Sequence, residues 1–461
     1  MIPRLDQLTA LLSLIRDPKR EREEIVSFQN RQLRRLVTHA YENVHYYRKL
    51  FDRNRIKPQD IRSVEDLSII PITSRKDIQS LSVEEVVSRG VNPNHLIDHK
   101  TSGSSGEPIT IRLTWLEHTI FILFRQHAAM LGPGLRIRDR QASIVLIRPP
   151  HPRDNQVPIR VLRSLGLLRK VQIDCLLPPV DIVRRLRDFR PDVLTGFPGV
   201  ISQISQIISD NDRMVIRPRL IVVGGETLTP LMRTQITEAF SAPVFDFYAS
   251  YEFSLIAWEC KETGELHTSD DTVIVEVLKD GRPAAPGERG EVVGTNLYSF
   301  AMPFIRYRLG DIVTKGFETC RCGQTFSTIR AIQGRMLDYF PLPGGRVIHP
   351  YEITIPHILG AAPWIRQYQL IQEQEDRIIL RAVPSTTPTP QELARLEESV
   401  INFLGQDVEF RVVLVPEIQI EPSGKFRISR SLVRSDYDGI DWEKPQTDRP
   451  NSSVRRDNGI R

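Results

Sequence analysis

The sequence predicts an α/β protein, with a large N-terminal domain of mixed sheets and flanking helices and a small α+β C-terminal domain. Three observations support this fold class. The chain has 461 residues, more than the roughly 250–300 that one core accommodates. Short β-rich runs alternate with helical patterns over residues 95–330, which is typical of sheets flanked by helices. After residue 345 the pattern changes to strand, helix, strand.

The N-terminal part is expected to be helical. Apolar and aromatic residues recur at helical spacing over residues 28–54, which predicts two or more helices that end before residues 63–72. These helices should pack onto the larger body.

The central part predicts a sheet with ligand sites at its strand ends. Strands are expected at 142–147, 171–177, 192–197, 220–226 and 243–250, and helices at 180–189, 200–210 and 231–240. This alternation favours a parallel or mixed sheet, in which ligands bind at the carboxyl ends of the strands. Antiparallel strands should follow at 272–278, 290–297 and 311–317.

The C-terminal part predicts two strands over 364–383, a helix at 389–405 and a strand at 407–415. We place the domain boundary at Leu337, near Gly334, Gly344 and Gly345, so that the domains are 1–336 and 337–435. Residues 436–461 are expected to form a disordered tail, because their end is polar and basic without an apolar period.

Composition excludes several classes of protein. The 62 basic and 57 acidic residues are interspersed, which indicates a mixed surface and no nucleic-acid partner. No run approaches the ~18–20 apolar residues of a membrane span, and four cysteines are too few for a disulfide framework. We therefore expect a cytoplasmic protein, and a homodimer remains possible.

The stretch "TSGSSGEP" at 101–108 predicts an anion-binding turn. It lies between 96–100 and 109–114, which can pair as a hairpin. Its glycines would expose backbone N–H groups, and its hydroxyls would add donors; the residues concerned are Thr101, Ser102, Gly103, Ser104, Ser105 and Gly106. The lysine of a P-loop is absent, and Glu107 stands where a cation is expected. A plain flexible hairpin is the alternative.

Several further motifs follow in a fixed order: "GGE" at 224–226, "DFYASYE" at 246–252, "YRLGD" at 307–311, "GRMLD" at 334–338 and "PSGKFR" at 422–427. This series resembles the acyl-adenylate-forming superfamily. Residues 43–78 are similar to its phenylacetate-CoA ligase branch, which includes capsule-biosynthesis-type homologues. The resemblance spans roughly residues 25–435.

The resemblance implies a two-step reaction and its cofactors. A small, for example aromatic, carboxylic acid would attack the α-phosphate of ATP with Mg²⁺ bound, releasing pyrophosphate, and coenzyme A would then take the acyl group from the acyl-adenylate. The turn at residues 101–106 would hold the β- and γ-phosphates. The small C-terminal domain would be mobile and would carry the adenylation lysine.

The resemblance also implies roles for the nucleotide-site residues. The backbone of Gly224, Gly225 and Glu226 would line one face of adenine and Tyr248 the other. Glu252 would bind Mg²⁺ through carboxylate oxygen, Asp311 would accept both ribose hydroxyls, and Arg335 would lie close to the same ribose. Glu252 could instead be a surface carboxylate, and Asp311 could merely cap a turn.

Lys425 matches the family lysine that bridges the substrate carboxylate and the α-phosphate, and a solvated lysine is the alternative reading. Three positions depart from the family pattern. Ala249 and Tyr251 replace a glycine and a small hydroxyl residue, and Leu337, followed by Asp338, stands where the family has an acidic pivot.

Cys260, His267, Cys320 and Cys322 offer three thiolates and one imidazole, enough for a closed zinc site. Reduced, unliganded thiols are the alternative, but several members of the ligase branch carry a structural Zn²⁺ in this region. Cys175 stands in an apolar run and is expected to be a buried core thiol.

Two other functions stay open. The chain could transfer AMP or an acyl-adenylate to an acceptor other than coenzyme A, as branch members that modify a deazaflavin cofactor do. It could also be a catalytically impaired homologue that acts in polysaccharide biosynthesis. The acid itself is not assigned, although Phe197, Pro198 and Phe247 should lie near the site by their order along the sheet.

Overall fold

A computed structural model describes residues 20–100, 109–119, 125–136, 138–147, 169–335, 340–348, 350–359, 361–420 and 425–433. The described residues group into two compact units. The first comprises those within Met1–Leu337, Gln367–Gln369 and Val415–Ile428, and the second those within Asp338–Arg366, Leu370–Leu414 and Ser429–Arg461. The segment that contains Lys425 therefore makes its contacts with the first unit.

The N-terminal helices are present and pack on the sheet, as predicted. Helix α2 (Arg22–Asn43) and helix α3 (His45–Arg53) bury apolar residues at helical spacing against Ile274, Leu297 and Ile305. The Tyr47 hydroxyl donates to the carbonyl of Pro303 at 3.2 Å and accepts from the backbone N–H of Ile305 at 2.9 Å. These bonds join the N-terminal helices to a segment far along the chain.

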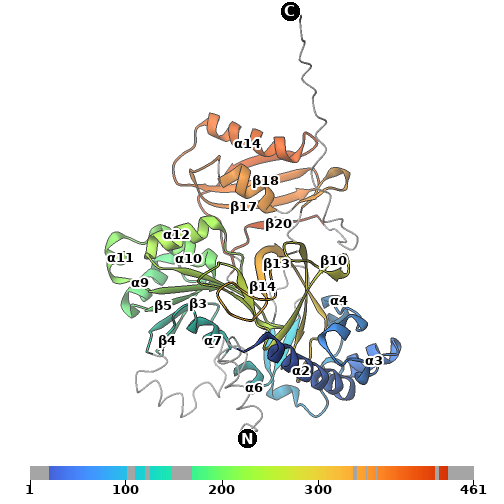
Figure 1. The fold of residues 1–461 in the computed structure, drawn as a ribbon. Helices are drawn as coiled ribbons and strands as arrows, with labels where there is room; N and C mark the ends of the chain where they lie inside the picture. The colour runs from blue at the N-terminus through green and yellow to red at the C-terminus, as the bar shows by residue number, and fades with distance from the viewer. Residues whose placement is uncertain are drawn as a thin grey trace, which may run out of the picture. The chain divides into compact units, whose positions relative to one another are not determined.

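A twelve-stranded sheet dominates the first unit, with the order β11-β10-β12-β13-β14-β9-β8-β7-β6-β5-β3-β4. Figure 1 shows β3, β4, β5, β10, β13 and β14 of this sheet. Its strands are β3 (Gln141–Val145), β4 (Lys170–Asp174), β5 (Val193–Gly196), β6 (Leu220–Gly224), β7 (Val244–Ser250), β8 (Ser254–Glu259), β9 (Leu266–Thr268), β10 (Val273–Lys279), β11 (Arg282–Pro283), β12 (Arg289–Asn296), β13 (Tyr307–Lys315) and β14 (Thr328–Arg335). The mixed α/β class predicted from the sequence is confirmed.

Strands β3 to β7 form the parallel half of this sheet. Their connections run through helices α9 (Pro179–Phe189), α10 (Pro198–Ile207), α11 (Asp210–Val215) and α12 (Pro230–Phe240), and α10 packs against both α9 and α12 (Figure 1). Helices α9, α10 and α12 each begin with proline at the first helical position, and Thr229 is the N-cap of α12. The carboxyl ends of β5, β6 and β7 consequently lie along one edge.

The antiparallel half begins where β8 folds back on β7. Strands β8, β9 and β14 were not predicted from the sequence. The β9 segment has three residues, too few for a period to be visible, and β14 mixes charged residues and glycine into its apolar alternation. These three strands link the parallel half to β13, β12 and β10.

The second unit contains a four-stranded sheet of order β19-β18-β17-β20 and helix α14 (Pro390–Leu404). Its strands are β17 (Ile365–Gln374), β18 (Arg377–Pro384), β19 (Glu409–Leu414) and β20 (Ser429–Ser431). Thr389 caps α14 by accepting from the N–H of Glu392 at 3.3 Å, and Leu396, Val400 and Leu404 are buried. The predicted order of strands, helix and strand is confirmed.

Shorter elements complete the fold: η2 (Pro58–Asp60), η3 (Val64–Ile69), α4 (Arg75–Gln79), α5 (Val83–Val86), η4 (Pro93–His95), α6 (Trp115–His118), α7 (Gln126–Leu131), η8 (Pro343–Gly345), α13 (Pro350–Ile353), η9 (Thr354–Leu359), and the pair β15 (Phe340–Pro341) and β16 (Val347–Ile348). Strands β1 (Ile97–Lys100) and β2 (Thr110–Leu113) pair antiparallel. This confirms the hairpin predicted to flank the "TSGSSGEP" stretch.

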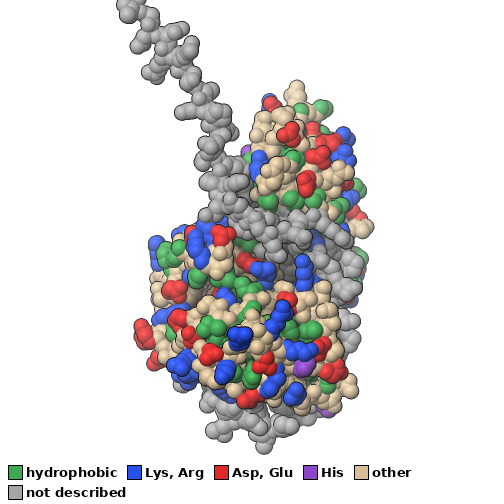
Figure 2. Space-filling model, turned by 90° about the vertical axis from the view of Figure 1, so that its right-hand side faces the viewer, with side chains coloured by type: hydrophobic (Ala, Val, Ile, Leu, Met, Phe, Trp, Pro, Cys, Tyr) green, Lys and Arg blue, Asp and Glu red, His purple; other side chains and the backbone are tan. Residues whose placement is uncertain are grey.

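Two surface properties bear on partners. Acidic and basic side chains are intermixed over the face shown in Figure 2, as the composition predicts. Within the part of the chain that the structure describes, no helix combines the length and apolar character that a membrane crossing requires.

Candidate functional site

The "GGE" motif ends strand β6 at the edge where nucleotide binding was predicted. Gly224 lies opposite Phe247 of β7, and a Cβ on Gly224 would collide with the carbonyl oxygen of Phe247. Gly225 has a φ of +81°, and a Cβ there would stand 3.0 Å from the Phe197 ring. Only glycine fits both positions without a shift of the backbone, so the two strands and the Phe197 ring meet closely here.

Tyr248 and Asp311 are brought together although they come from different motifs. The Tyr248 hydroxyl, on β7, donates to Oδ2 of Asp311, on β13, at 2.6 Å. Both side chains are buried, with 8 % and 7 % of their surface exposed. A short bond to a carboxylate in such surroundings is of the strong, charge-assisted kind. It fixes the phenol ring beside the carboxylate.

Arg335 adjoins this pair in the sheet, and Glu252 comes four residues after Tyr248 in the same motif. Asp311 stands directly opposite Arg335 in the β13–β14 ladder, with the Arg335 side chain outside the described residues. Glu252 lies in the turn that joins β7 to β8, and its backbone carbonyl accepts from Nδ2 of Asn296 at 2.9 Å. The structure therefore gathers the "GGE", "DFYASYE" and "YRLGD" motifs in one region.

Lys425 lies on a segment that contacts the "GGE" motif. The next residue, Phe426, is 4 % exposed and donates its backbone N–H to Oε1 of Glu226. The other carboxylate oxygen of Glu226 accepts from the N–H of Gly199 at 3.0 Å. Lys425 itself is half-buried.

Tyr251, one of the departures from the family pattern, takes part in a stack of aromatic rings. Its ring lies 5.1 Å from that of His99 at an interplanar angle of 18°, and His99 stacks on His118 in the same way. The Nε2 of His99 and the Nδ1 of His118 are 3.1 Å apart. Because His99 belongs to β1, this stack ties the turn after β7 to the hairpin from which residues 101–108 continue.

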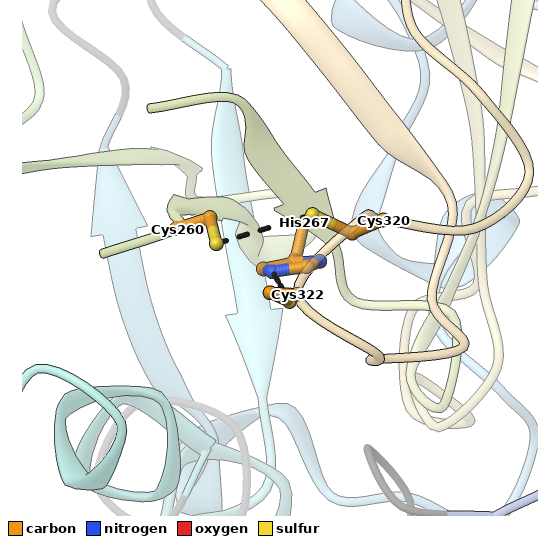
Figure 3. A group of neighbouring side chains, drawn as sticks. All are labelled: Cys260, His267, Cys320 and Cys322. Carbon is orange, nitrogen blue, oxygen red and sulfur yellow. Dashed lines mark hydrogen bonds between the residues drawn. The ribbon is translucent and has the colours of Figure 1, made fainter. Parts of the chain in front are cut away.

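Cys260, His267, Cys320 and Cys322 form a compact cluster, shown in Figure 3. Their ligand atoms all lie within 4.8 Å of one another. The Sγ atoms of Cys260 and Cys320 are 3.9 Å apart, and Nε2 of His267 is 3.4 Å from Sγ of Cys322. Two sulfurs bound at 2.3 Å to a tetrahedral Zn²⁺ stand about 3.8 Å apart, so the spacing fits a bound metal.

Turns and strands hold the four ligands in place. Cys260 follows β8, and its backbone N–H and carbonyl bond to Glu265 and Gly264 at 2.7 and 3.0 Å. His267 lies in β9, and Cys320 and Cys322 lie in the turn between β13 and β14. Three of the four residues are buried, and Cys322 is partly exposed. Such a cluster suits a structural metal site, in which protein ligands fill every position.

The protonation tendencies of this cluster suit a metal as well. Burial lowers the pKa of His267 to about 4, so its imidazole is neutral. Burial raises the pKa of Cys322 to about 12, while the pKa of Cys260 is lowered by hydrogen bonds from Thr263 and nearby backbone despite its burial. A metal ligated here would displace the Cys322 proton, which makes its binding dependent on pH.

The metal cluster lies at the end of β8 away from Glu252 but toward Tyr248. Glu252 precedes this strand and Cys260 follows it, and a six-residue strand is roughly 20 Å long at the usual rise. Tyr248 pairs with Ala257 in the β7–β8 ladder, so the cluster is far from Glu252 along β8 but lies toward the same end of the strand as Tyr248.

Several predicted residues are not described. The turn at residues 101–108, with Glu107, and both Leu337 and Asp338 lie outside the described part of the chain. Cys175 is 1 % exposed, and burial raises its pKa to about 11, which agrees with the expected core thiol.

Sequence reasoning missed three features of this region: the Glu226 carboxylate, the close approach at Gly199, and the His99–His118 stack. The partners of Glu226 stand 27 and 200 residues away in the sequence, so spacing could not reveal them. The signal available was a carboxylate directly after two glycines at a strand end.

Comparisons with known proteins agree with this arrangement. The family profile of the CapK C-terminal domain matches residues 343–431. The chain is 26 % identical to a phenylacetate-coenzyme A ligase of Thermus thermophilus over 77 % of this chain and 79 % of the relative. It is 25 % identical to protein CapK of Staphylococcus aureus over 90 % and 91 % of the two chains. The resemblance to the phenylacetate-CoA ligase branch is confirmed.

Solved structures show the same fold. A 2-hydroxyisobutyryl-CoA ligase in complex with an acyl-AMP superposes with a TM-score of 0.73, 20 % identity and coverage of 89 % of this chain and 90 % of the other. A MatB protein of Rhodopseudomonas palustris with bound ATP gives a TM-score of 0.51 at 16 % identity, covering 74 % and 68 %. The chain therefore has the fold of adenylate-forming ligases.

Proposed function

We propose that the protein is an AMP-forming carboxylic acid–CoA ligase that activates an aromatic or other small acid through an acyl-adenylate. Relatives named as phenylacetate-coenzyme A ligases align with most of the chain. The structural observation that carries the proposal is the meeting of Tyr248 and Asp311 beside the end of β6. A buried aromatic ring next to a carboxylate suits a nucleoside, because the ring can stack on a base while the carboxylate accepts from ribose hydroxyls.

In this proposal each motif residue keeps the role implied by the family resemblance. Tyr248 and the backbone of residues 224–226 flank adenine, Asp311 binds the ribose, Glu252 ligates Mg²⁺, and the turn at residues 101–106 binds the β- and γ-phosphates. Lys425 supplies positive charge to the reacting carboxylate and α-phosphate. The catalytic contribution of the chain is positioning and charge stabilisation, since the acid itself is the nucleophile.

The Cys260, His267, Cys320 and Cys322 cluster is proposed to bind a structural Zn²⁺. Three soft thiolates and one imidazole favour zinc over a hard cation such as Mg²⁺. We also propose that coenzyme A is the acyl acceptor and that the protein is located in the cytoplasm.

Pyrophosphate release across a panel of carboxylic acids, with and without coenzyme A, tests this function. Wild-type protein should release pyrophosphate with at least one acid and form a thioester only when coenzyme A is present. Lys425→Ala should bind Mg-ATP normally and lose roughly a hundredfold to a thousandfold in adenylation rate, equivalent to about 3–4 kcal/mol. Equal rates in the two proteins would remove Lys425 from the mechanism.

The similarity to CapK supports a second candidate. It covers 90 % of the chain, and the C-terminal profile carries the same name. The chain could transfer the activated group to an acceptor other than coenzyme A, or act in polysaccharide biosynthesis with impaired catalysis. Acyl-adenylate formation with no thioester when coenzyme A is supplied would favour the first of these, and Mg-ATP binding without turnover would favour the second.

A further inference from the structure

The Glu226 carboxylate joins three segments that are distant in the sequence. One oxygen accepts from the backbone N–H of Gly199, at the start of helix α10, at 3.0 Å. The other accepts from the backbone N–H of Phe426. All three residues belong to the first compact unit. A carboxylate that receives one N–H on each oxygen makes two charge-assisted bonds, which are about twice as strong as neutral ones.

The packing around Gly199 adds a steric requirement to these bonds. A Cβ on Gly199 would overlap the Cβ of Phe426 and would stand 2.9 Å from Oε2 of Glu226. Phe426 is 4 % exposed, so its side chain is packed on nearly all sides. The absence of a side chain at residue 199 is thus what allows the start of α10 and the Phe426 segment to approach each other.

We propose that Glu226 is a positioning residue that docks the Lys425 segment for adenylation. This inference rests on the proposed function, because it assigns Lys425 the adenylation step. Adjacent Cα atoms are about 3.8 Å apart, so a bond at the Phe426 N–H fixes the peptide that carries Lys425. The Glu226 carboxylate acts through that peptide and needs no contact with the substrate.

The docking has a consequence for the two half-reactions. Lys425 is useful while charge builds on the α-phosphate, and the thioester step has no need of it. Weakening the Glu226 contacts should therefore slow acyl-adenylate formation selectively. Only the backbone of residue 226 is assigned to adenine, and the Glu226 side chain contacts Gly199 and Phe426, so ATP affinity should be kept when that side chain is changed.

Two variants test the proposal by different physical routes, with one matched control. Glu226→Gln keeps the shape of the side chain but presents an NH₂ group to one of the two donors. Gly199→Ala leaves the carboxylate and pushes Phe426 away. Glu238→Gln changes an exposed carboxylate on helix α12 and should behave as wild type.

Hydrogen–deuterium exchange of peptides that contain Phe426 gives a readout that needs no activity. Both test variants should exchange the Phe426 amide at least tenfold faster, with the rest of the first unit unchanged. Exchange at the wild-type rate in both would overturn the docking contact. Exchange confined to Phe426 also excludes general misfolding as the cause.

Single-turnover kinetics give the second readout. Adenylation should fall about tenfold to a hundredfold in Glu226→Gln and Gly199→Ala, with unchanged Mg-ATP affinity, while thioester formation from supplied acyl-adenylate stays within twofold. An equal loss in both half-reactions would overturn the selective role. If wild-type protein forms no adenylate with any acid, the proposed function fails, and the exchange result still decides whether Glu226 holds the segment.

Discussion

At the scale of single residues, Tyr248 shows how a site is assembled across the sheet. Its hydroxyl bonds to a carboxylate 63 residues further along the chain. The residue type was identified from the family motif, but the bond was not predicted, because sequence order does not say which strands become neighbours. The bond exists because β8, β9 and β14 bring β13 into the same sheet as β7.

Tyr248→Phe should therefore cost stability. Removing the hydroxyl leaves the buried Asp311 carboxylate without this donor, and the loss of a bond to a charged group is typically about 1.5–3 kcal/mol. Tyr41→Phe is a matched control, because the Tyr41 hydroxyl bonds to Asp52 at 2.9 Å on the exposed surface and should contribute under about 1 kcal/mol. Urea unfolding of the three proteins measures both values, and equal losses would contradict the strong buried bond.

At the scale of elements, the helices and strands with a clear hydrophobic periodicity were predicted from the sequence. Helices α9, α10 and α12 and strands β3 to β7 lie within a few residues of the expected ranges, because buried strands are continuous apolar runs and helices show a repeat of 3.6 residues. The six-residue helix α11 was not predicted. Strand β9 was not predicted, because three residues are too few to show a hydrophobic repeat. The four metal ligands were identified from residue type, spacing and the family resemblance, and their convergence depends on β9 and the β13–β14 turn.

The metal cluster should contain zinc. Protein purified without added metal is expected to carry about one Zn²⁺ per chain, following the four-ligand composition of structural sites. Cys322→Ser should lower the zinc content and the free energy of unfolding, because the turn between β13 and β14 loses its link to β9. Cys175→Ser is the control, since Cys175 lies outside the cluster. Elemental analysis below a tenth of one equivalent in wild-type protein would exclude the site.

The β7–β8 pair should make stability depend on pH. Burial, reinforced by the neighbouring Glu259 carboxylate, raises the pKa of Asp246 from 3.8 to about 7. Between these values the folded state binds a proton that the unfolded state does not, so stability falls as pH rises through this window. The slope contributed by one proton is at most about 1.4 kcal/mol per pH unit.

Asp246→Asn isolates this effect, because the amide cannot ionise. The variant should lack the decrease that wild-type protein shows from pH 4 to 7 and should be the more stable of the two at pH 8. Denaturant unfolding at several pH values measures the difference. If the free energy of unfolding of the two proteins changed with pH in the same way, the ionisation of Asp246 would have no effect on stability.

At the scale of the whole molecule, the described residues of the candidate site belong to one of the two compact units. Tyr248, Glu226 and the Lys425 segment lie in the first unit, although the segment follows most of the second unit in the sequence. The sequence assigned Lys425 to a domain of residues 337–435, and that domain scheme stays a proposal. Periodicity finds elements and cannot reveal that Val415–Ile428 makes its contacts with the earlier part of the chain.

Mg-ATP should stabilise the two units unequally. Calorimetry is expected to resolve two transitions, and nucleotide at about a hundred times its dissociation constant should add ~2.7 kcal/mol to the unit that binds it. The transition of the first unit should move to higher temperature while the other stays in place. Asp311→Asn should reduce the shift, and a shift of both transitions by the same amount would indicate one cooperative molecule.

The pairing of the N-terminal helices with late strands affects how the chain folds as it is synthesised. The Tyr47 hydroxyl accepts from the backbone N–H of Ile305, which is synthesised 258 residues later. At roughly 5–20 residues per second of translation, that interval lasts on the order of ten to fifty seconds. During this time α2 and α3 have emerged from the ribosome while Ile274, Leu297 and Ile305 have not yet been made. The nascent chain thus presents an apolar helical face to the cell before its own sheet can cover it, which makes it a natural client for chaperones that bind ribosome-attached chains.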